Sequence, residues 1–320
     1  MCTAISHNGF FGRNLDLEYG FQQQVVITPR NLPLIFRKAQ TIHIHHAYIG
    51  MATVDHGFPL YFDGLNEQGL CIAALDFPQN AYYPQPDEGI TNIAPFEFIP
   101  WILSQCGTVD EVTDLMKKTQ ISDISYSASF PQSPLHWLVA DKNKCIVIEP
   151  MMGGIQIHHN PVGVLCNNPP FPYHLLNLTN YQHLTPGEQT ASFEGINLPP
   201  YSGGMGAIGL PGDYSSPSRF VKAAFVKQHS HSSTEPTSEV TQFFHILDSV
   251  SMPKGAIRVR GGQDEITQYS CCCDMSTSMY YFTTYKNRRI QAVKLQNVNL
   301  NETRIETFSL LDQQDIFYKN

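Results

Sequence analysis

The chain has 320 residues, of which 42% are hydrophobic and 15% are charged, a composition that supports a sizeable core and excludes an intrinsically disordered chain. Its formal net charge is −8 without any run of Lys and Arg, so we expect neither nucleic acid nor an anionic membrane surface as a partner. No segment approaches the ~20 apolar residues of a membrane span, and the first residues lack the basic and apolar parts of a secretion signal. We therefore expect a cytoplasmic protein.

The order of predicted elements indicates an α+β protein in one domain, residues 1–320. Apolar or alternating runs predict strands at residues 10–15, 24–28, 48–54, 60–65, 69–75, 135–140, 145–149, 155–159, 162–166, 267–273, 279–285 and 290–294. Helices are predicted in two pairs, at 94–106 and from 108, and at 218–229 and 238–250. This order lacks the βαβ alternation of a parallel sheet and favours antiparallel sheets with segregated helices. Residues 168–217, rich in Pro, Gly, Asn and Ser, are predicted as a long loop excursion.

Three other patterns have simple structural explanations. Residues 204–209 read GMGAIG, but flanking prolines replace the strand and helix that a dinucleotide site requires. The cluster His43-Ile44-His45-His46 has no matching carboxylate spacing, which favours a polar strand face over a metal site. The cysteines other than Cys2 show no C-x-x-C spacing, and we interpret them as reduced packing residues.

Cys2 directly follows the first methionine and is the leading candidate for chemistry. If Met1 is removed, Cys2 carries a thiol and a free α-amine, whose pKa of ~8 allows it to accept a proton near neutral pH. A thiol beside such a base and a guanidinium is partly ionised and nucleophilic. The alternative is a cysteine that stands at this position by chance.

Arg13 and Asp16, in the next predicted strand, provide the charges that a thiol and amine pair needs. They are equally consistent with an exposed strand pair. A spacing of three places them on opposite faces of a regular strand, so a bulge or bend is needed if both face one pocket.

Two later residues extend the candidate site. Asn167 ends a predicted strand, where its side-chain amide is able to donate to an oxyanion, although an Asn near a proline is also a common turn residue. Arg219 stands at the start of a predicted helix, where its charge opposes the helix dipole and a specific partner would explain it. A solvated arginine is the alternative.

Several segments together resemble the choloylglycine hydrolase family, the bile salt hydrolases and penicillin V acylases among the N-terminal-nucleophile hydrolases. The segments are residues 1–3 (MCT), 11–16 (FGRNLD), 28–31 (TPRN), 63–70 (DGLNEQGL), 135–137 (LHW), 162–169 (VGVLCNNP), 209–213 (GLPGD) and 218–220 (SRF). The resemblance covers nearly the whole chain and is strongest to the bile salt hydrolases of Gram-positive gut bacteria.

This resemblance implies a four-layer αββα sandwich, a small-molecule substrate and no metal or cofactor. It implies Cys2 as nucleophile with its α-amine as base, Arg13 close to the thiol and Asp16 hydrogen-bonded to the amine. Asn167 is then an oxyanion donor and Arg219 completes the polar network. It also implies a homotetramer, with an excursion such as residues 184–206 reaching a neighbouring copy.

Two departures from the family pattern bear on the substrate. Bile salt hydrolases usually have Asn, and penicillin V acylases often Tyr, where this chain has Asp76, whose backbone N–H is expected to serve the oxyanion. Gly203 stands where similar enzymes often have Arg. Both changes make the site more negative, so the preferred conjugate stays open. By analogy and residue type, the candidates for the acyl pocket are Leu15, Phe21, Tyr126 and Phe130.

Three functions remain open from the sequence. The first is hydrolysis of glycine- or taurine-conjugated bile salts, and the second is the same chemistry on penicillin V or another acylated amine. The third is a non-enzymatic family member with binding or structural duties. Asp76 and Gly203 leave the choice between the first two undecided.

Overall fold

The computed structural model describes residues 1–127, 132–188, 193, 195–231, 233, 235–259, 261–311 and 313–320. Two antiparallel sheets form its centre. The six-stranded sheet has the order β13-β1-β2-β14-β15-β16, so the first two strands of the chain lie in its middle. Its strands are β1 (Cys2–His7), β2 (Phe10–Leu17), β13 (Val164–Cys166), β14 (Ile266–Asp274), β15 (Met279–Thr284) and β16 (Gln291–Lys294).

The second sheet has nine strands in the order β12-β11-β10-β7-β6-β4-β3-β17, and β5 pairs with β4 beside this path. Its strands are β3 (Gln24–Thr28), β4 (Tyr48–Asp55), β5 (Phe58–Tyr61), β6 (Asp63–Asn66), β7 (Cys71–Asp76), β10 (Leu135–Ala140), β11 (Cys145–Met151), β12 (Gly154–His159) and β17 (Glu306–Phe308). A separate short pair, β8 (Thr91–Ile93) and β9 (Thr119–Ile121), is parallel.

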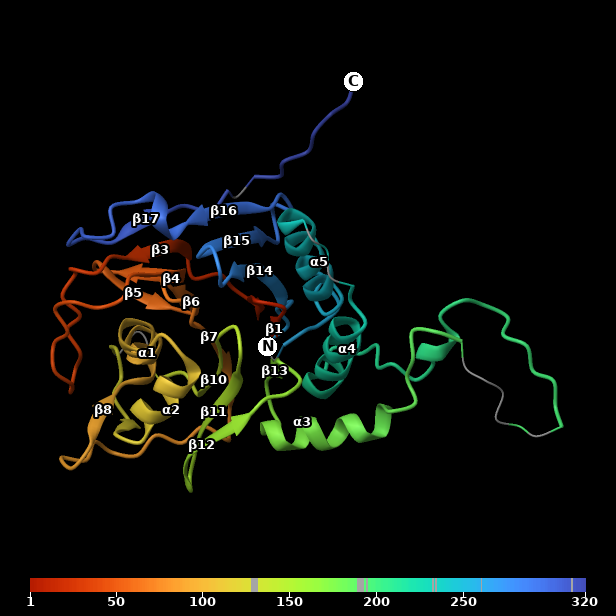
Figure 1. Ribbon diagram of the computed structural model, residues 1–320, viewed down its shortest axis with the longest axis horizontal. Helices are drawn as coiled ribbons and strands as arrows, with labels where there is room; N and C mark the ends of the chain where they lie inside the picture. The colour runs from red at the N-terminus through yellow and green to blue at the C-terminus, as the bar shows by residue number, and fades with distance from the viewer. Residues whose placement is uncertain are drawn as a thin grey trace.

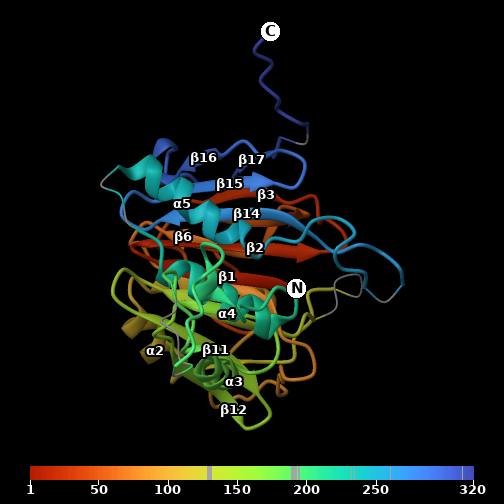
Figure 2. The same ribbon diagram turned by 90° about the vertical axis from the view of Figure 1, so that its right-hand side faces the viewer.

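Helices cover the outer faces of both sheets, as Figure 1 shows. The nine-stranded sheet is covered by α1 (Phe98–Gln105) and α2 (Val109–Met116). The six-stranded sheet is covered by α4 (Ser216–Gln228) and α5 (Pro236–Asp248), which lie over β1, β2 and β14 in Figure 2. The short helix α3 (Phe171–Leu178) packs against α4. These layers confirm the predicted α+β class and the αββα sandwich.

The central strands of the nine-stranded sheet are buried on both faces. Leu138 belongs to the core that lies between the sheets, whereas its neighbour Trp137 packs against α1 in a second core. Successive side chains of a strand point to opposite faces, so both faces must be apolar here. This explains why the strands of this sheet read as continuous apolar runs in the sequence.

The structure corrects two predictions of local structure. The segment Cys2–His7, which was not predicted as a strand, forms β1 and turns into β2 through Asn8 and Gly9, both of positive φ. Helix α3 lies inside the predicted loop 168–217, and residues 205–207 form only one 3-10 turn. Within the described part of the chain, no helix is long and apolar enough to cross a membrane.

The histidine cluster is not the expected strand face, because residues 43–46 lie in a loop. The ring of His45 is buried, and its nitrogens contact the main-chain oxygens of His46 at 2.7 Å and Leu32 at 2.9 Å. Both nitrogens therefore hold the loop in place and are not available as metal ligands.

Candidate active site

Strand pairing explains how Arg13 and Asp16 both reach Cys2. In the register of β1 and β2, Cys2 lies opposite Leu15 and Ala4 lies opposite Arg13. Residues that face each other in an antiparallel pair share a face, so the Cys2 and Arg13 side chains lie on one face and Asp16 lies on the other. The predicted face alternation is confirmed, and no bulge in β2 is needed. The Cys2 thiol lies on the same face as Arg13, and Asp16 lies close to the N-terminal end of β1.

Cys2 lies in a cavity of about 500 Å³, and only 3% of the residue is exposed. Among the predicted acyl-pocket residues, Leu15, Phe21 and Tyr126 line this cavity, and Phe130 lies outside the described residues. The other lining residues that matter below are Met1, Arg13, Glu18, Asp76 and Glu265. The cavity therefore joins the thiol, the chain amine and an apolar wall.

Arg13 is fully buried and held by main-chain oxygens. Its Nη1 donates to the oxygen of Phe62 at 3.1 Å and to that of Ala74. Its Nη2 is buried and has no hydrogen-bond partner among the described residues. Burial opposes the charge of this guanidinium, but the neighbouring Cys2 thiol and acidic groups raise its pKa above the usual value. Arg13 is thus a permanent cation with one donor left for a thiolate.

A buried carboxylate, Asp63, interacts electrostatically with Arg13. It accepts hydrogen bonds from the hydroxyl groups of Tyr269 and, at 2.7 Å, Tyr280. Burial raises the pKa of Asp63, and the charge of Arg13 opposes that rise. The charge of Asp63 partly balances that of Arg13, which helps to place a cation in the interior.

Asp16 keeps one oxygen ready for an amine. Its Oδ1 accepts from Thr267 Oγ1 at 2.6 Å, whereas Oδ2 is buried and unpaired within the part of the chain that the structure describes. The backbone nitrogen of Asp16 donates to the main-chain oxygen of Met1 at 2.9 Å, and the amine of Met1 donates to the main-chain oxygen of Asp16 at 2.7 Å. Burial raises the pKa of Asp16, while Arg219 and the chain amine oppose the rise. The free oxygen suits an ammonium at Cys2 after removal of Met1.

The side chain of Asn167 joins three parts of the site. Its Oδ1 accepts from the backbone nitrogen of Cys2 at 2.7 Å and from Arg219 Nη2 at 2.8 Å. Its Nδ2 donates to the main-chain oxygen of Asp76 at 2.7 Å. These bonds fix the amide orientation, with the nitrogen toward β7 and the oxygen toward Cys2. One hydrogen of Nδ2 remains for another acceptor.

Arg219 is buried, with 1% of the residue exposed, which rules out a solvated arginine. Its Nη1 donates to the main-chain oxygen of Cys2 and, at 2.7 Å, to Thr3 Oγ1. Its Nε donates to the oxygen of Tyr214 at 3.0 Å. The guanidinium therefore fixes the backbone of the first strand, and this partner explains a cation in the first turn of α4.

Asp76 lies at the end of β7 and reaches the same cavity. Burial raises the pKa of its carboxyl, and the chain amine and His136 oppose the rise. The amine of Met1 contacts the carboxylate of Glu265, of which only 3% is exposed. The six predicted catalytic residues are thus adjacent through these contacts, and two acidic groups flank the chain amine.

The chain matches the family model described as linear amide C–N hydrolases, choloylglycine hydrolase family, over residues 2–308. The chain belongs to the choloylglycine hydrolase family. A bile salt hydrolase/transferase of Lactiplantibacillus plantarum is 47% identical over 324 aligned residues, which cover 100% of both chains. A conjugated bile acid hydrolase of Lactobacillus gasseri is 36% identical, covering 96% of this chain and 100% of the other.

Two solved structures confirm the fold. A crystal structure of a mutant conjugated bile acid hydrolase from Clostridium perfringens has a TM-score of 0.92 at 33% identity, covering 100% of both chains. Penicillin V acylase from Agrobacterium tumefaciens has a TM-score of 0.77 at 17% identity, covering 97% of this chain and 91% of the other, and so shares the fold. The chain is accordingly a linear amide C–N hydrolase with the sandwich fold that its sequence resemblance implied.

Sequence reasoning missed several residues of the site in this hydrolase. Thr267 and Glu265 lie near the start of β14, far from Cys2 in the sequence, and no local pattern marks them. Asp63 could have been found from the sequence, since a carboxylate beside an apolar predicted strand needs a buried partner. His174 contacts the main-chain oxygen of Asn167 at 2.9 Å and stacks on Phe220, so α3 supports Asn167.

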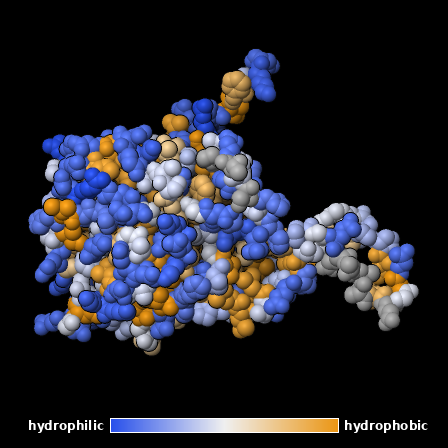
Figure 3. Space-filling view, viewed as in Figure 1, coloured by the Kyte–Doolittle hydropathy of each residue, from blue (hydrophilic) through white to orange (hydrophobic). Residues whose placement is uncertain are grey.

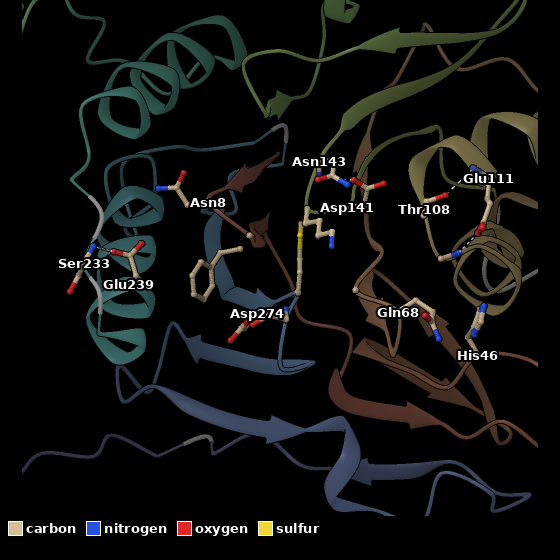
Figure 4. A pocket seen from close by; sticks show the side chains of 17 residues that line it. Asn8, His46, Gln68, Thr108, Glu111, Asp141, Asn143, Ser233, Glu239 and Asp274 are labelled. Atoms are coloured by element: carbon tan, nitrogen blue, oxygen red, sulfur yellow. Dashed lines mark hydrogen bonds between the residues drawn. The ribbon is translucent and has the colours of Figure 1, made fainter.

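A larger cavity, about 800 Å³, lies at the other end of β1 beside Asn8, as Figure 4 shows. Its carboxylates are occupied by local structure. Asp141 accepts from the backbone nitrogen of Val109 at 2.8 Å, and Glu111 accepts from that of Gly107 at 2.6 Å. Ser276 donates to Asp274 Oδ1 at 2.7 Å in this cavity, but that carboxylate also accepts from the backbone nitrogen of Ser276 at 2.8 Å and from Thr277 Oγ1 at 2.6 Å, as in a local turn. We therefore take the Cys2 cavity as the candidate active site.

Proposed function

We propose that this protein is a bile salt hydrolase that cleaves the amide bond of glycine- or taurine-conjugated bile salts. The observation that carries the proposal is the place of Cys2, whose thiol faces an apolar cavity beside Arg13 and whose backbone nitrogen is held by Asn167. A cavity of about 500 Å³ suits a rigid apolar acyl group of small-molecule size. The names of the relatives in Lactiplantibacillus and Lactobacillus support the same substrate class.

The active form begins at Cys2. Removal of Met1 converts the amide nitrogen of Cys2 into an α-amine, which lies within reach of Asn167 Oδ1 and close to the unpaired oxygen of Asp16. The neutral amine takes the proton of the thiol and becomes an ammonium, and the thiolate is stabilised by the charge of Arg13. Asp16 holds the ammonium that results.

Acylation follows from this ion pair. The Cys2 thiolate attacks the amide carbon, a C–S bond forms and the carbonyl oxygen becomes an oxyanion. The second hydrogen of Asn167 Nδ2 and the backbone N–H of Asp76 are the proposed donors to that oxyanion. The α-ammonium then protonates the leaving nitrogen, the C–N bond breaks, and the free amino acid departs.

Deacylation uses the same groups in reverse. The α-amine, neutral after it has given up its proton, activates a water that attacks the thioester carbon. The C–S bond breaks, the bile acid leaves, and the proton returns to the site. Leu15, Phe21 and Tyr126 are the proposed contacts of the acyl group, because they form the apolar wall next to Cys2. Phe130 remains a proposal on family analogy alone.

Replacement of Cys2 by Ala tests this function. The variant is expected to keep its fold and lose glycocholate hydrolysis, since it lacks the thiol that forms the acyl intermediate. Release of glycine and taurine is measured for both proteins, together with penicillin V hydrolysis as the alternative activity. Turnover by the Ala variant would refute the proposed nucleophile. Faster cleavage of penicillin V than of either conjugate would replace the proposed substrate.

We also propose a homo-oligomer, a tetramer on family analogy, in the cytoplasm. The segment between α3 and α4 extends from the body as an arm (residues 179–215 with gaps) in Figure 1. Figure 3 shows apolar surface on this arm and at its base. Its exposed large apolar side chains and those of α3 are Tyr173, Leu176, Phe193, Ile196, Leu198, Tyr201 and Ile208. Exposed apolar surface of this kind favours burial against another copy. All eight cysteines are free, as the cytoplasm favours.

A further inference from the structure

The two proposed oxyanion donors come from different sheets. Asp76 ends β7 of the nine-stranded sheet, whereas Asn167 directly follows β13 of the six-stranded sheet. The hydrogen bond from Asn167 Nδ2 to the main-chain oxygen of Asp76 at 2.7 Å joins them. Catalytic donors have to be held to within about 0.5 Å of their working positions, so the two sheets must be fixed relative to each other at this point.

A buried carboxylate, Glu149, links the two sheets close to these donors. It lies in β11 of the nine-stranded sheet and is fully buried. Its Oε1 accepts from the backbone nitrogen of Phe171 at 2.9 Å, and Nδ1 of His136 lies 3.2 Å from the same oxygen. Glu149 does not line the Cys2 cavity that the described residues form, so any effect on catalysis acts through its neighbours.

On one side, Glu149 supports the end of β7. His136 of β10 lies opposite Leu75 of β7 in the strand register. Its ring stacks on Phe77, with 4.2 Å between the ring centroids and 6° between the planes. Burial lowers the pKa of His136, so the ring is neutral at neutral pH, and the carboxylate oxygen opposite Nδ1 places its hydrogen there. Glu149 thus orients the ring that packs on the residue after Asp76.

On the other side, Glu149 holds the start of α3. The residues on both sides of Phe171 are prolines, which lack a backbone N–H, and the N–H of Phe171 donates to Glu149. A carboxylate at this end of a helix also interacts favourably with the helix dipole. One turn later, His174 contacts the main-chain oxygen of Asn167 at 2.9 Å. Glu149 therefore fixes the helix that supports the second donor.

One carboxylate is thus the common support of both donors. We propose that Glu149 is a positioning residue that sets the place of Asn167 relative to the backbone N–H of Asp76 when the oxyanion forms. This inference rests on the proposed function, because it concerns the oxyanion of the same hydrolysis. Both contacts use Oε1, so the position of this oxygen, and not the charge of the group, produces the effect.

Two variants of Glu149 separate position from charge. Glu149→Asp keeps the carboxylate but withdraws it by one methylene, and is expected to lower kcat for glycocholate by about tenfold to a hundredfold with little change in KM. Glu149→Gln keeps an oxygen at the original reach and is expected to retain kcat within about threefold. An Asp variant with the wild-type kcat, or a Gln variant no faster than the Asp variant, would overturn the positioning role.

Glu67→Asp is the matched control. Glu67 also accepts from a backbone nitrogen, that of Ala47 at 2.9 Å, and its Oε1 lies 3.9 Å from Nδ1 of His46. It does not line the Cys2 cavity of the described residues. The control is expected to keep the wild-type kcat, and equal losses in Glu67→Asp and Glu149→Asp would contradict a specific role of Glu149.

Coupling to Asn167 separates positioning from a general loss of structure. In protein that already carries Asn167→Ala, Glu149→Asp is expected to lower kcat by no more than about threefold further, because the donor that it positions is absent. Losses that multiply in the double variant would overturn the proposal. Failure of Met1-free wild-type protein to cleave either conjugate would refute the proposed function itself, whereas normal wild-type turnover with unaffected Glu149 variants would refute the positioning role alone.

Discussion

At the scale of single residues, the side chain of Asn167 joins Cys2, Asp76 and Arg219. Asn167→Ala removes the proposed oxyanion donor together with the acceptor for the Cys2 nitrogen. The expected result is a fall in kcat of about 10²–10³ with a smaller change in KM, since the oxyanion bond exists only in the transition state. Steady-state glycocholate hydrolysis measures both. Asn168→Ala is the control, because that side chain donates to Pro78 outside this network. Similar losses in the two variants would contradict the role of Asn167.

His174 gives the fold a dependence on pH. Burial is the main cause that lowers its pKa to about 4, so the ring is neutral in the folded protein at neutral pH. In the unfolded chain its pKa is ~6.5, and between these values the unfolded state binds the additional proton. The stability from neutral His174 is therefore complete above pH 6.5 and declines as the pH falls toward 4.

Replacement of His174 by Gln is expected to flatten this decline. Across pH 4.5–6.5 the slope of the unfolding free energy falls by up to about 1.4 kcal/mol per pH unit, the value for one proton. Urea unfolding at several pH values measures the slope for both proteins. His136, also buried with a lowered pKa, is present in both proteins, and its charge is one of the causes that lower the pKa of His174. Parallel curves would show that His174 does not titrate in this range.

Sequence reasoning at this scale succeeded where chemistry marks a residue. Cys2 is marked by its position, and Arg13 and Asp16 by charge within an apolar segment, so the sequence predicts that the three belong together, and the structure places them close to one another. The strand register, in which Cys2 lies opposite Leu15, explains how Arg13 and Asp16 on opposite faces of β2 both lie near Cys2. Glu265 and Thr267 join the site through strand pairing over 250 residues away, which a single sequence does not encode locally.

At the scale of elements, β2 fits against β14 with no space for a larger residue at Gly12. A Cβ there would lie 1.9 Å from the main-chain oxygen of Cys271. Gly12→Ala is therefore expected to separate the two strands, lower Tm by at least several degrees and reduce activity, because β2 carries Arg13. Gly212→Ala, where nothing lies within 4 Å, is the control and is expected to change Tm little. Unchanged Tm in Gly12→Ala would contradict this packing.

Most elements were predictable because their apolar patterns are strong. The strands at residues 48–54 and 135–140 match β4 and β10 closely. Helix α3 was missed because prolines and asparagines around it are typical of loops, although Phe171 and His174 bury one face against the core. Strand β1 was missed because its polar residues, such as Thr3, are buried by contacts with Arg219 and not by apolar packing.

At the scale of the whole molecule, the arm and α3 expose a set of apolar side chains that we assign to contacts between copies. Leu176→Asp with Tyr201→Asp is expected to convert the oligomer into smaller species, because both residues are highly exposed in the single chain. Light scattering after size-exclusion chromatography measures the mass. Ile44→Asp, an equally exposed apolar residue on another loop, is the control. Retention of the full mass by the double variant would exclude this surface.

The central claim is that the mature enzyme starts at Cys2 and carries its acyl intermediate on that thiol. Intact-mass measurement of protein mixed rapidly with glycocholate and quenched in acid tests it most directly. The account predicts a chain without Met1 and a transient added mass of one cholyl group, mapped to Cys2 by peptide fragmentation. Active protein that retains Met1, or a cholyl adduct on any other residue, would contradict it.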